Sequence, residues 1–140
     1  MAVNNPYSNY KQTEVQTKSP GELTLMLYEG CLKFMKRAEK AMEEKNIQEK
    51  NENLIKAQNI IRELMVTLNT DVEISKQMMQ MYDFILNRLI EANTKNSLQA
   101  LKEAEQFVIE FRDTWKEVIK IDRRQRHSAR PVASQTGETT

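Results

Sequence analysis

Apolar residues recur every three or four positions along most of the chain, the spacing that places them on one side of an α-helix. Four segments carry this pattern, and short polar stretches separate them. Because short connections place successive helices antiparallel, the pattern predicts an all-α fold, an antiparallel up-down four-helix bundle. The positions predicted to face its core are Leu27, Tyr28, Cys31, Phe34, Met35, Ala38 and Met42; Ile47, Leu54, Ala57, Ile61, Leu64 and Leu68; Met78, Met81, Tyr82, Ile85, Leu89 and Ala92; and Leu101, Ala104, Phe107, Val108, Phe111, Trp115 and Val118.

Local signals mark where the helices begin. Ser19 lies three residues before Glu22, and this pair predicts a capping box at the start of the first helix. Asn46 is a predicted N-cap for the second helix, and either Asn96 or Ser97 for the fourth. The cap positions agree with the limits that the apolar spacing sets.

Both ends of the chain depart from the helical pattern. Residues 1–18 are mostly polar but carry two large rings, Tyr7 and Tyr10. We expect them to form an extended N-terminal arm that could cover part of the bundle temporarily. The bundle itself is predicted over residues 19–124. The polar residues 125–140 are predicted to form a disordered C-terminal tail.

Composition indicates the cellular location of such a bundle and the partners that it does not attract. The chain has 21 basic and 20 acidic side chains, so its net charge of +1 gives no overall field to attract nucleic acid or an anionic membrane. No apolar run approaches the roughly 18 residues of a membrane-spanning helix, and the N-terminus lacks a signal-peptide core. Cys31 is the only cysteine, so no internal disulfide can form. We therefore expect a cytoplasmic protein with no direct membrane insertion and no nucleic-acid partner.

The residues needed for catalysis are missing from the predicted bundle. The one histidine, His127, falls in the predicted tail, where nothing would fix its geometry. Di-iron helical bundles use Glu-x-x-His pairs, and the sequence has none. It also has no Cys-x-x-Cys pair and no glycine-rich phosphate loop. We therefore predict no catalytic residue, no metal, no cofactor and no enzymatic activity.

Several helices carry more apolar surface than one core stripe requires. At about 100° per residue, some large apolar side chains fall at the edge of the predicted core face or outside it. Such an excess often marks a partner site, and methionines on the third segment would let it adapt to a bound helix. The residues we expect to line a partner-binding groove are Ile55, Ile60, Met81, Phe84 and Leu98.

Nine short motifs, in order and in one register over about residues 4–121, resemble the flagellar secretion chaperone family (FliS). They are Asn5-Pro6-Tyr7-x-x-Tyr10, Ser19-Pro20-Gly21-Glu22-Leu23, Leu27-Tyr28-Glu29-Gly30, Lys56-Ala57-Gln58, Ile60-Ile61-x-Glu63-Leu64, Leu68-Asn69, Met81-Tyr82-Asp83-Phe84-Ile85, Leu89-Ile90-x-Ala92-Asn93 and Phe111-Arg112-x-x-Trp115. The resemblance implies a cytosolic export chaperone that binds the C-terminal segment of unassembled flagellin and prevents premature polymerisation. It also implies delivery to the membrane export gate of the flagellar type III apparatus, with a second flagellar assembly factor as a further candidate partner. In the family, cargo displaces the N-terminal arm, whose tyrosines match Tyr7 and Tyr10.

Two other functions fit the residues alone. A structural or scaffold bundle would close its extra apolar faces on a second copy of itself. A nucleic-acid binder would use the basic residues between 116 and 130, although Glu117 and Asp122 interrupt that run.

Overall fold

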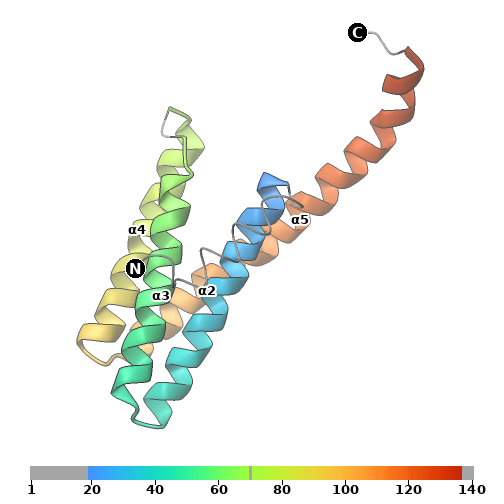
Figure 1. Cartoon of the computed structure of the whole chain (residues 1–140). Coiled ribbons are helices and arrows are strands. Elements are labelled where there is room, and N and C mark those ends of the chain that lie inside the picture. The colour runs from blue at the N-terminus through green and yellow to red at the C-terminus, as the bar shows by residue number, and fades with distance from the viewer. Residues whose placement is uncertain (1–18, 70, 137–140) are drawn as a thin grey trace, which may run out of the picture.

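The computed structural model describes residues 19–69 and 71–136, the last ten of them by their backbone alone. This part of the chain forms four helices and no strand: α2 (Pro20–Glu43), α3 (Ile47–Val66), α4 (Glu73–Thr94) and α5 (Leu98–Thr136). Successive helices run antiparallel, each packs against the next, and α5 returns to pack against α2 (Figure 1). The predicted all-α, up-down four-helix bundle is confirmed.

The predicted caps begin three of the helices. The Ser19 hydroxyl accepts the backbone N–H of Glu22 at 3.2 Å, and the Glu22 carboxylate accepts the backbone N–H of Ser19 at 3.2 Å, which completes the capping box. The Asn46 side chain accepts the N–H of Glu49 at 3.1 Å. Ser97 caps α5, because its hydroxyl accepts the N–H of Ala100 at 3.0 Å.

Two helices end in the same way, with a residue in the left-handed region. Lys45 (φ 59°) follows α2, and Asn96 (φ 51°) follows α4. After α2, the N–H of Asn46 donates to the carbonyl of Ala41 at 2.8 Å, and after α4 the N–H of Ser97 reaches the carbonyl of Ala92 at 3.1 Å. These bonds satisfy carbonyls that a helix end leaves free, and they reverse the chain within three residues.

The two helix pairs diverge toward the end of the bundle where α2 begins. In Figure 1 the α3–α4 pair leans away from the α2–α5 pair at that end, whereas all four helices meet at the opposite end. We call these the open end and the closed end. The core between them is a continuous cluster of buried apolar side chains, with Cys31, Met35, Ile61 and Leu89 at 0% exposure.

Two positions predicted to face the core are exposed. Ile47 is 66% exposed, because it is the first residue of α3 and no neighbouring helix covers it at the closed end. Val118 is 43% exposed, because it follows Trp115 on the part of α5 from which the α3–α4 pair has diverged. The apolar spacing predicted their helical phase but not where the neighbouring helices stop.

Lys50 interrupts the predicted apolar stripe of α3, yet its side chain is buried. Its ammonium donates to the carbonyl of Asn93 at 3.2 Å and to the side-chain oxygen of Asn96 at 3.3 Å. It therefore satisfies the C-terminal end of α4, where the helix dipole favours a cation. Lys50 ties α3 to the turn between α4 and α5 at the closed end.

The predicted disordered tail is helical where the structure describes it, because α5 continues to Thr136. Its polar composition pointed to disorder, yet the helix continues through Pro131, which has no backbone N–H to donate. Arg126 also pairs with Asp122 at 2.6 Å one turn earlier, the spacing that stabilises exposed helices. Residues 137–140 of the predicted tail lie outside the described residues, as does the whole predicted arm.

Candidate partner-binding surface

The predicted partner-binding residues fall into three groups of different exposure. Ile55, Phe84 and Leu98 are exposed, at 47%, 43% and 42%, and Met81 is half-buried. Ile60 is buried. Tyr7 and Tyr10 lie outside the described residues.

Ile60 does not line a surface groove, and this part of the prediction is wrong. Its side chain is 1% exposed and belongs to the core cluster. A Cβ added to Gly30 on α2 would lie 3.5 Å from the Cδ1 atom of Ile60. α2 and α3 pack against each other at this point, and their contact covers a position that helical phase alone placed at the edge.

Met81 and Phe84 lie together on the side of α4 that faces α5. The Phe84 ring meets the Phe107 ring of α5 edge to face, with centroids 5.2 Å apart and an interplanar angle of 73°. Met81 precedes Phe84 by three residues, so both side chains lie on one side of the helix. We call Met81, Phe84 and Phe107 the α4–α5 apolar surface.

A fixed charge borders this surface. The guanidinium of Arg88 lies 5.9 Å from the centroid of the Phe84 ring. It pairs with Glu91 at 2.6 Å and with Glu103 of α5 at 3.3 Å. These carboxylates hold Arg88 in place, so the Phe84 ring is bordered by a charged group in a fixed position. Such a surface suits a partner that has an apolar face and a polar rim.

Ile55 and Leu98 lie on other sides of the bundle. Ile55 is one turn before Asn59, whose side-chain oxygen accepts a hydrogen bond from Arg62 at 3.2 Å on the exposed side of α3. Leu98 is one turn before Lys102, which pairs with Glu39 of α2 at 2.6 Å. The structure thus brings Met81 and Phe84 together but does not bring Ile55 or Leu98 to them.

The sequence prediction missed further exposed apolar residues at the open end. They are Val72 and Ile74 at the start of α4 and Ile121 on α5, exposed at 45%, 58% and 48%. On the α2–α5 side of this end lies a groove of about 330 Å³, which is lined by Glu22, Leu25, Met26, Glu29, Lys116, Ile119, Lys120 and Arg123. For Val72 and Ile74, the sequence signal was their position directly after the polar turn Asn69-Thr70-Asp71.

Three aromatic rings lie at the junction of the two helix pairs. The hydroxyls of Tyr28 on α2 and Tyr82 on α4 are 2.6 Å apart. The Phe111 ring of α5 stacks on Tyr28 at 5.9 Å and packs against Tyr82 at 5.7 Å. One turn after Phe111 on α5, the indole N–H of Trp115 donates to the carbonyl of Gly21 at 2.8 Å. These contacts hold α2, α4 and α5 together where the pairs begin to diverge.

Two tyrosines and the cysteine of the core are held in their neutral forms. Burial raises the pKa of both tyrosine hydroxyls, Tyr28 and Tyr82, and also that of the Cys31 thiol. Cys31 donates to the carbonyl of Ala57 at 3.8 Å and is fully buried, so it is a packing residue without nucleophilic character. No cluster of three metal-ligating side chains occurs among the described residues. What the described residues offer at this surface is contact with apolar side chains.

Known proteins resemble this chain over most of its length. The family described as "Flagellar protein FliS" matches residues 3–122. The flagellar secretion chaperone FliS of Bacillus subtilis (strain 168) is 52% identical over 133 residues, which are 95% of this chain and 100% of that protein. The chain belongs to the FliS family. The FliS of Escherichia coli (strain K12) is 33% identical over 111 residues, covering 77% of this chain and 82% of that protein.

A solved structure shares the fold of this FliS chain. A bacterial flagellar chaperone crystal structure superposes with a TM-score of 0.68 at 21% identity, covering 81% of this chain and 94% of that one. FliS proteins are flagellar secretion chaperones and not enzymes, which confirms the predicted family and the predicted lack of enzymatic activity. Within the described residues, no helix has the length and apolar character needed to cross a membrane.

Proposed function

We propose that this FliS chain binds the C-terminal segment of unassembled flagellin in the cytoplasm, prevents its premature polymerisation and delivers it to the flagellar type III export apparatus. The observation that carries the proposal is the α4–α5 apolar surface on a protein of a secretion chaperone family. A segment that builds a filament core must present apolar helix faces before assembly. Covering such faces requires exposed rings and flexible apolar chains of the kind found here.

The separation of the exposed candidates supports an extended cargo. Phe84 lies beside α5, whereas Ile55 and Leu98 lie on other sides of the bundle. A compact ligand could not touch all three. A segment that is disordered when free and becomes helical around the bundle could contact each of them in turn. We keep Met81, Phe84, Ile55 and Leu98 as proposed contacts and leave out Ile60, which is in the core.

Calorimetric titration of the purified chain with a peptide of the flagellin C-terminal segment tests this function. We expect binding at micromolar concentration or below. Phe84→Ala should weaken it by about tenfold, because the substitution removes a central aromatic contact. Ile47→Ala is the matched control: Ile47 is 66% exposed at the closed end, away from the α4–α5 apolar surface. Absence of binding by a folded sample would rule out the proposal, and equal losses in both variants would rule out the assigned surface.

The proposed gate is the N-terminal arm, with Tyr7 and Tyr10 as the residues that cargo displaces. Stopped-flow association of the same peptide with Tyr10→Ala tests this role. If the arm competes with cargo, association should be as fast as in the wild type or faster. A marked slowing would instead make the Tyr10 ring a direct cargo contact.

Delivery requires a second interaction. We propose that the loaded chaperone is recognised by the membrane protein of the flagellar export gate, and that a second flagellar assembly factor can join the complex. Co-purification of the gate's cytosolic part with the chaperone, with and without flagellin, tests this step. Equal recovery in both conditions would contradict delivery of a loaded complex.

A further inference from the structure

Three cationic side chains from two helices converge on one aromatic ring. Phe34 of α2 is 7% exposed at the contact between α2 and α3. The ammonium of Lys33 lies 5.2 Å from its ring centroid, the guanidinium of Arg37 lies 5.8 Å from it, and the ammonium of Lys56 on α3 lies 5.4 Å from it. Any two of these charges are therefore within about 11 Å of each other, close to one Debye length at 0.1 M salt. We call Lys33, Arg37 and Lys56 the Phe34 cation cluster.

The cluster has no acidic partner among the residues that the structure describes. Other cations of the chain do have such partners. Lys36 of α2 pairs with Glu105 of α5 at 3.0 Å, and this hydrogen bond raises the pKa of Lys36. On α5, Lys120 pairs with Glu117 and Arg123 pairs with Glu22. The Phe34 cation cluster is thus a concentration of positive charge that no carboxylate of the described residues pairs with.

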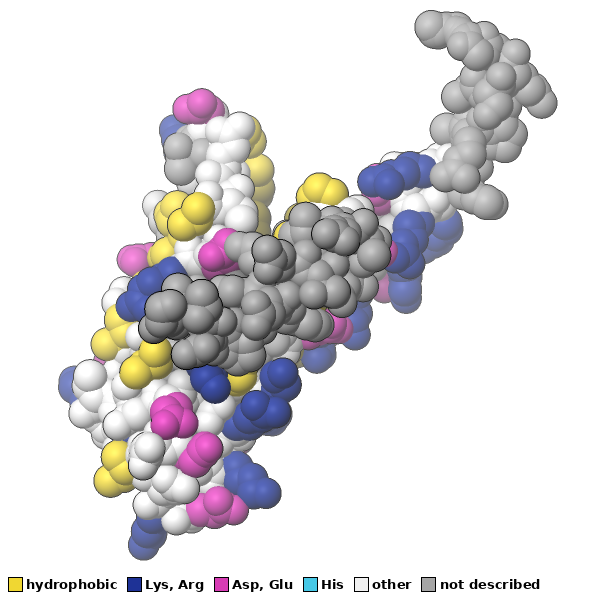
Figure 2. All heavy atoms as spheres, viewed as in Figure 1, with side chains coloured by type: hydrophobic (Ala, Val, Ile, Leu, Met, Phe, Trp, Pro, Cys, Tyr) yellow, Lys and Arg dark blue, Asp and Glu magenta, His cyan; other side chains and the backbone are white. Residues whose placement is uncertain are grey.

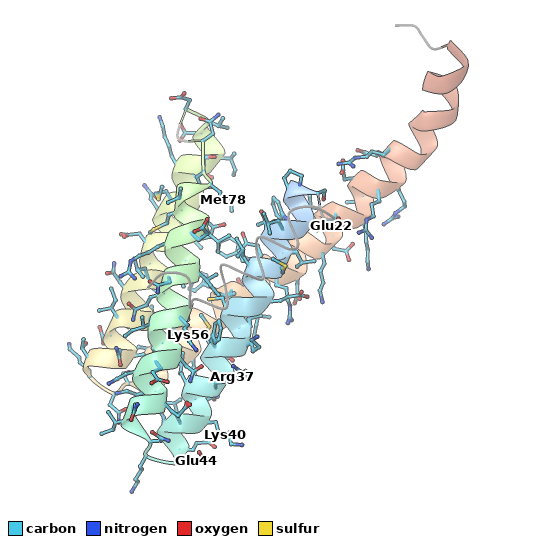
Figure 3. All side chains as sticks on the ribbon, viewed as in Figure 1. Glu22, Arg37, Lys40, Glu44, Lys56 and Met78 are labelled. Atoms are coloured by element: carbon cyan, nitrogen blue, oxygen red, sulfur yellow. The ribbon has the colours of Figure 1, made fainter. Side chains whose placement is uncertain are left out.

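The cluster forms a short basic surface with acidic limits. Figure 2 shows several Lys and Arg side chains over the lower part of the bundle, with Asp and Glu side chains beside them. Figure 3 shows Arg37 on α2 beside Lys56 on α3, followed along α2 by Lys40 and then Glu44. Glu29 lies one turn before Lys33 at the other limit, and both glutamates are exposed. From Lys33 to Lys40 the surface extends for about 10 Å along the helix.

We propose that the Phe34 cation cluster is a docking site for an acidic segment of a partner protein, one that presents two or three carboxylates about one helical turn apart. The short length of the surface fits a few carboxylates, whereas nucleic acid needs a basic track that follows many phosphates. Glu29 and Glu44 would repel a strand that continued past either limit. The cluster lies on α2 and α3, away from the α4–α5 apolar surface, and the proposal does not depend on flagellin binding.

A purely structural role for the three cations makes a different prediction. Cation–π contacts stabilise a fold, so their removal would lower the midpoint of unfolding. Three unpaired like charges also repel one another, and this repulsion weakens as salt is added. For a docking site, removal of the charges should leave the unfolding midpoint unchanged or raise it at low salt, and should weaken binding of the acidic partner at least about tenfold.

NMR titration of the ¹⁵N-labelled full chain tests the proposal. The probe is an alanine-based helical peptide with four glutamates one turn apart, added up to about 1 mM. The matched peptide has glutamine at those four positions. We expect shifts confined to residues 30–41 and 53–60, an affinity that falls between about 0.05 M and 0.3 M salt, and no response to the glutamine peptide. The absence of shifts, or shifts spread over α5, would overturn the proposal.

Two variants that each lose three positive charges distinguish binding at the Phe34 cation cluster from attraction by the net charge of the chain. Lys33→Gln/Arg37→Gln/Lys56→Gln should lower the affinity for the glutamate peptide at least about tenfold, whereas Lys95→Gln/Lys116→Gln/Arg124→Gln should change it less than about twofold. Equal losses would show general attraction and overturn the proposal. A single-stranded oligonucleotide of the same charge that bound this surface more tightly than the peptide would also overturn it. Flagellin binding by the first variant should be unchanged, so the two proposals can fail separately.

Discussion

Replacing Tyr28 by phenylalanine removes one of two hydroxyls that meet in the core. The two oxygens are 2.6 Å apart, and both tyrosines are at most 2% exposed. The substitution deletes their hydrogen bond and leaves the Tyr82 hydroxyl buried without a partner, which costs about 1–3 kcal/mol. The Phe111 ring still packs against both rings, so little packing is lost.

Removing both hydroxyls should cost less than removing either one. In Tyr28→Phe/Tyr82→Phe no polar group remains unpaired at this site, and replacing both partners by apolar groups can be nearly neutral. We therefore expect each single variant to lose about 1–3 kcal/mol of unfolding free energy and the double variant to lose less than about 1 kcal/mol.

Urea unfolding at pH 7, followed by circular dichroism, measures these free energies for the four proteins of the cycle. The denaturant slope should stay constant across the cycle, so that midpoint changes report stability. A double variant that loses the sum of the two single losses would show that the hydroxyls do not interact, and it would refute this reasoning.

Three further predictions concern pH and the closed end. Burial raises the pKa of the Tyr28 hydroxyl and the Cys31 thiol in the folded chain, so the unfolded chain loses these protons first as pH rises. The unfolding free energy should therefore be full below about pH 8 and fall progressively above it, and equal urea midpoints at pH 7 and about pH 10 would contradict this. Lys50→Ala removes hydrogen bonds to the turn that includes Asn96 and should cost about 2 kcal/mol in the same assay; a loss below about 0.5 kcal/mol would contradict the role of Lys50. Lys45→Gly removes the steric strain of a side chain at a positive φ and should raise the unfolding free energy by up to about 1 kcal/mol. A lower melting temperature would show that this strain does not limit the stability of the chain.

The helices could be predicted from the sequence because their signals are local. Cap residues such as Ser19 and Asn46 act on backbone groups three residues away, so a short window contains both partners. The apolar spacing likewise reports one helix at a time. For this reason the apolar spacing predicted the core face of each helix, and most of the predicted core positions are buried.

Positions that depend on a second helix were predicted less well. Ile60 is covered because α2 packs against α3 beside Gly30, and Val118 is exposed because α3 and α4 lean away from α5. Lys50 broke an apolar stripe in the sequence, and its acceptors Asn93 and Asn96 come from a turn more than forty residues later. The relative placement of helices decided each case, and helical periodicity contains no information about it.

The central claim, that this chain is a chaperone which shields flagellin from assembly, is tested most directly by flagellin polymerisation. Monomeric flagellin is mixed with short filament seeds and increasing amounts of the purified chain, and filament growth is followed by light scattering. We predict that growth falls in proportion to the chaperone added and stops near one chaperone per flagellin. Growth at an undiminished rate in the presence of excess folded chaperone would contradict the claim.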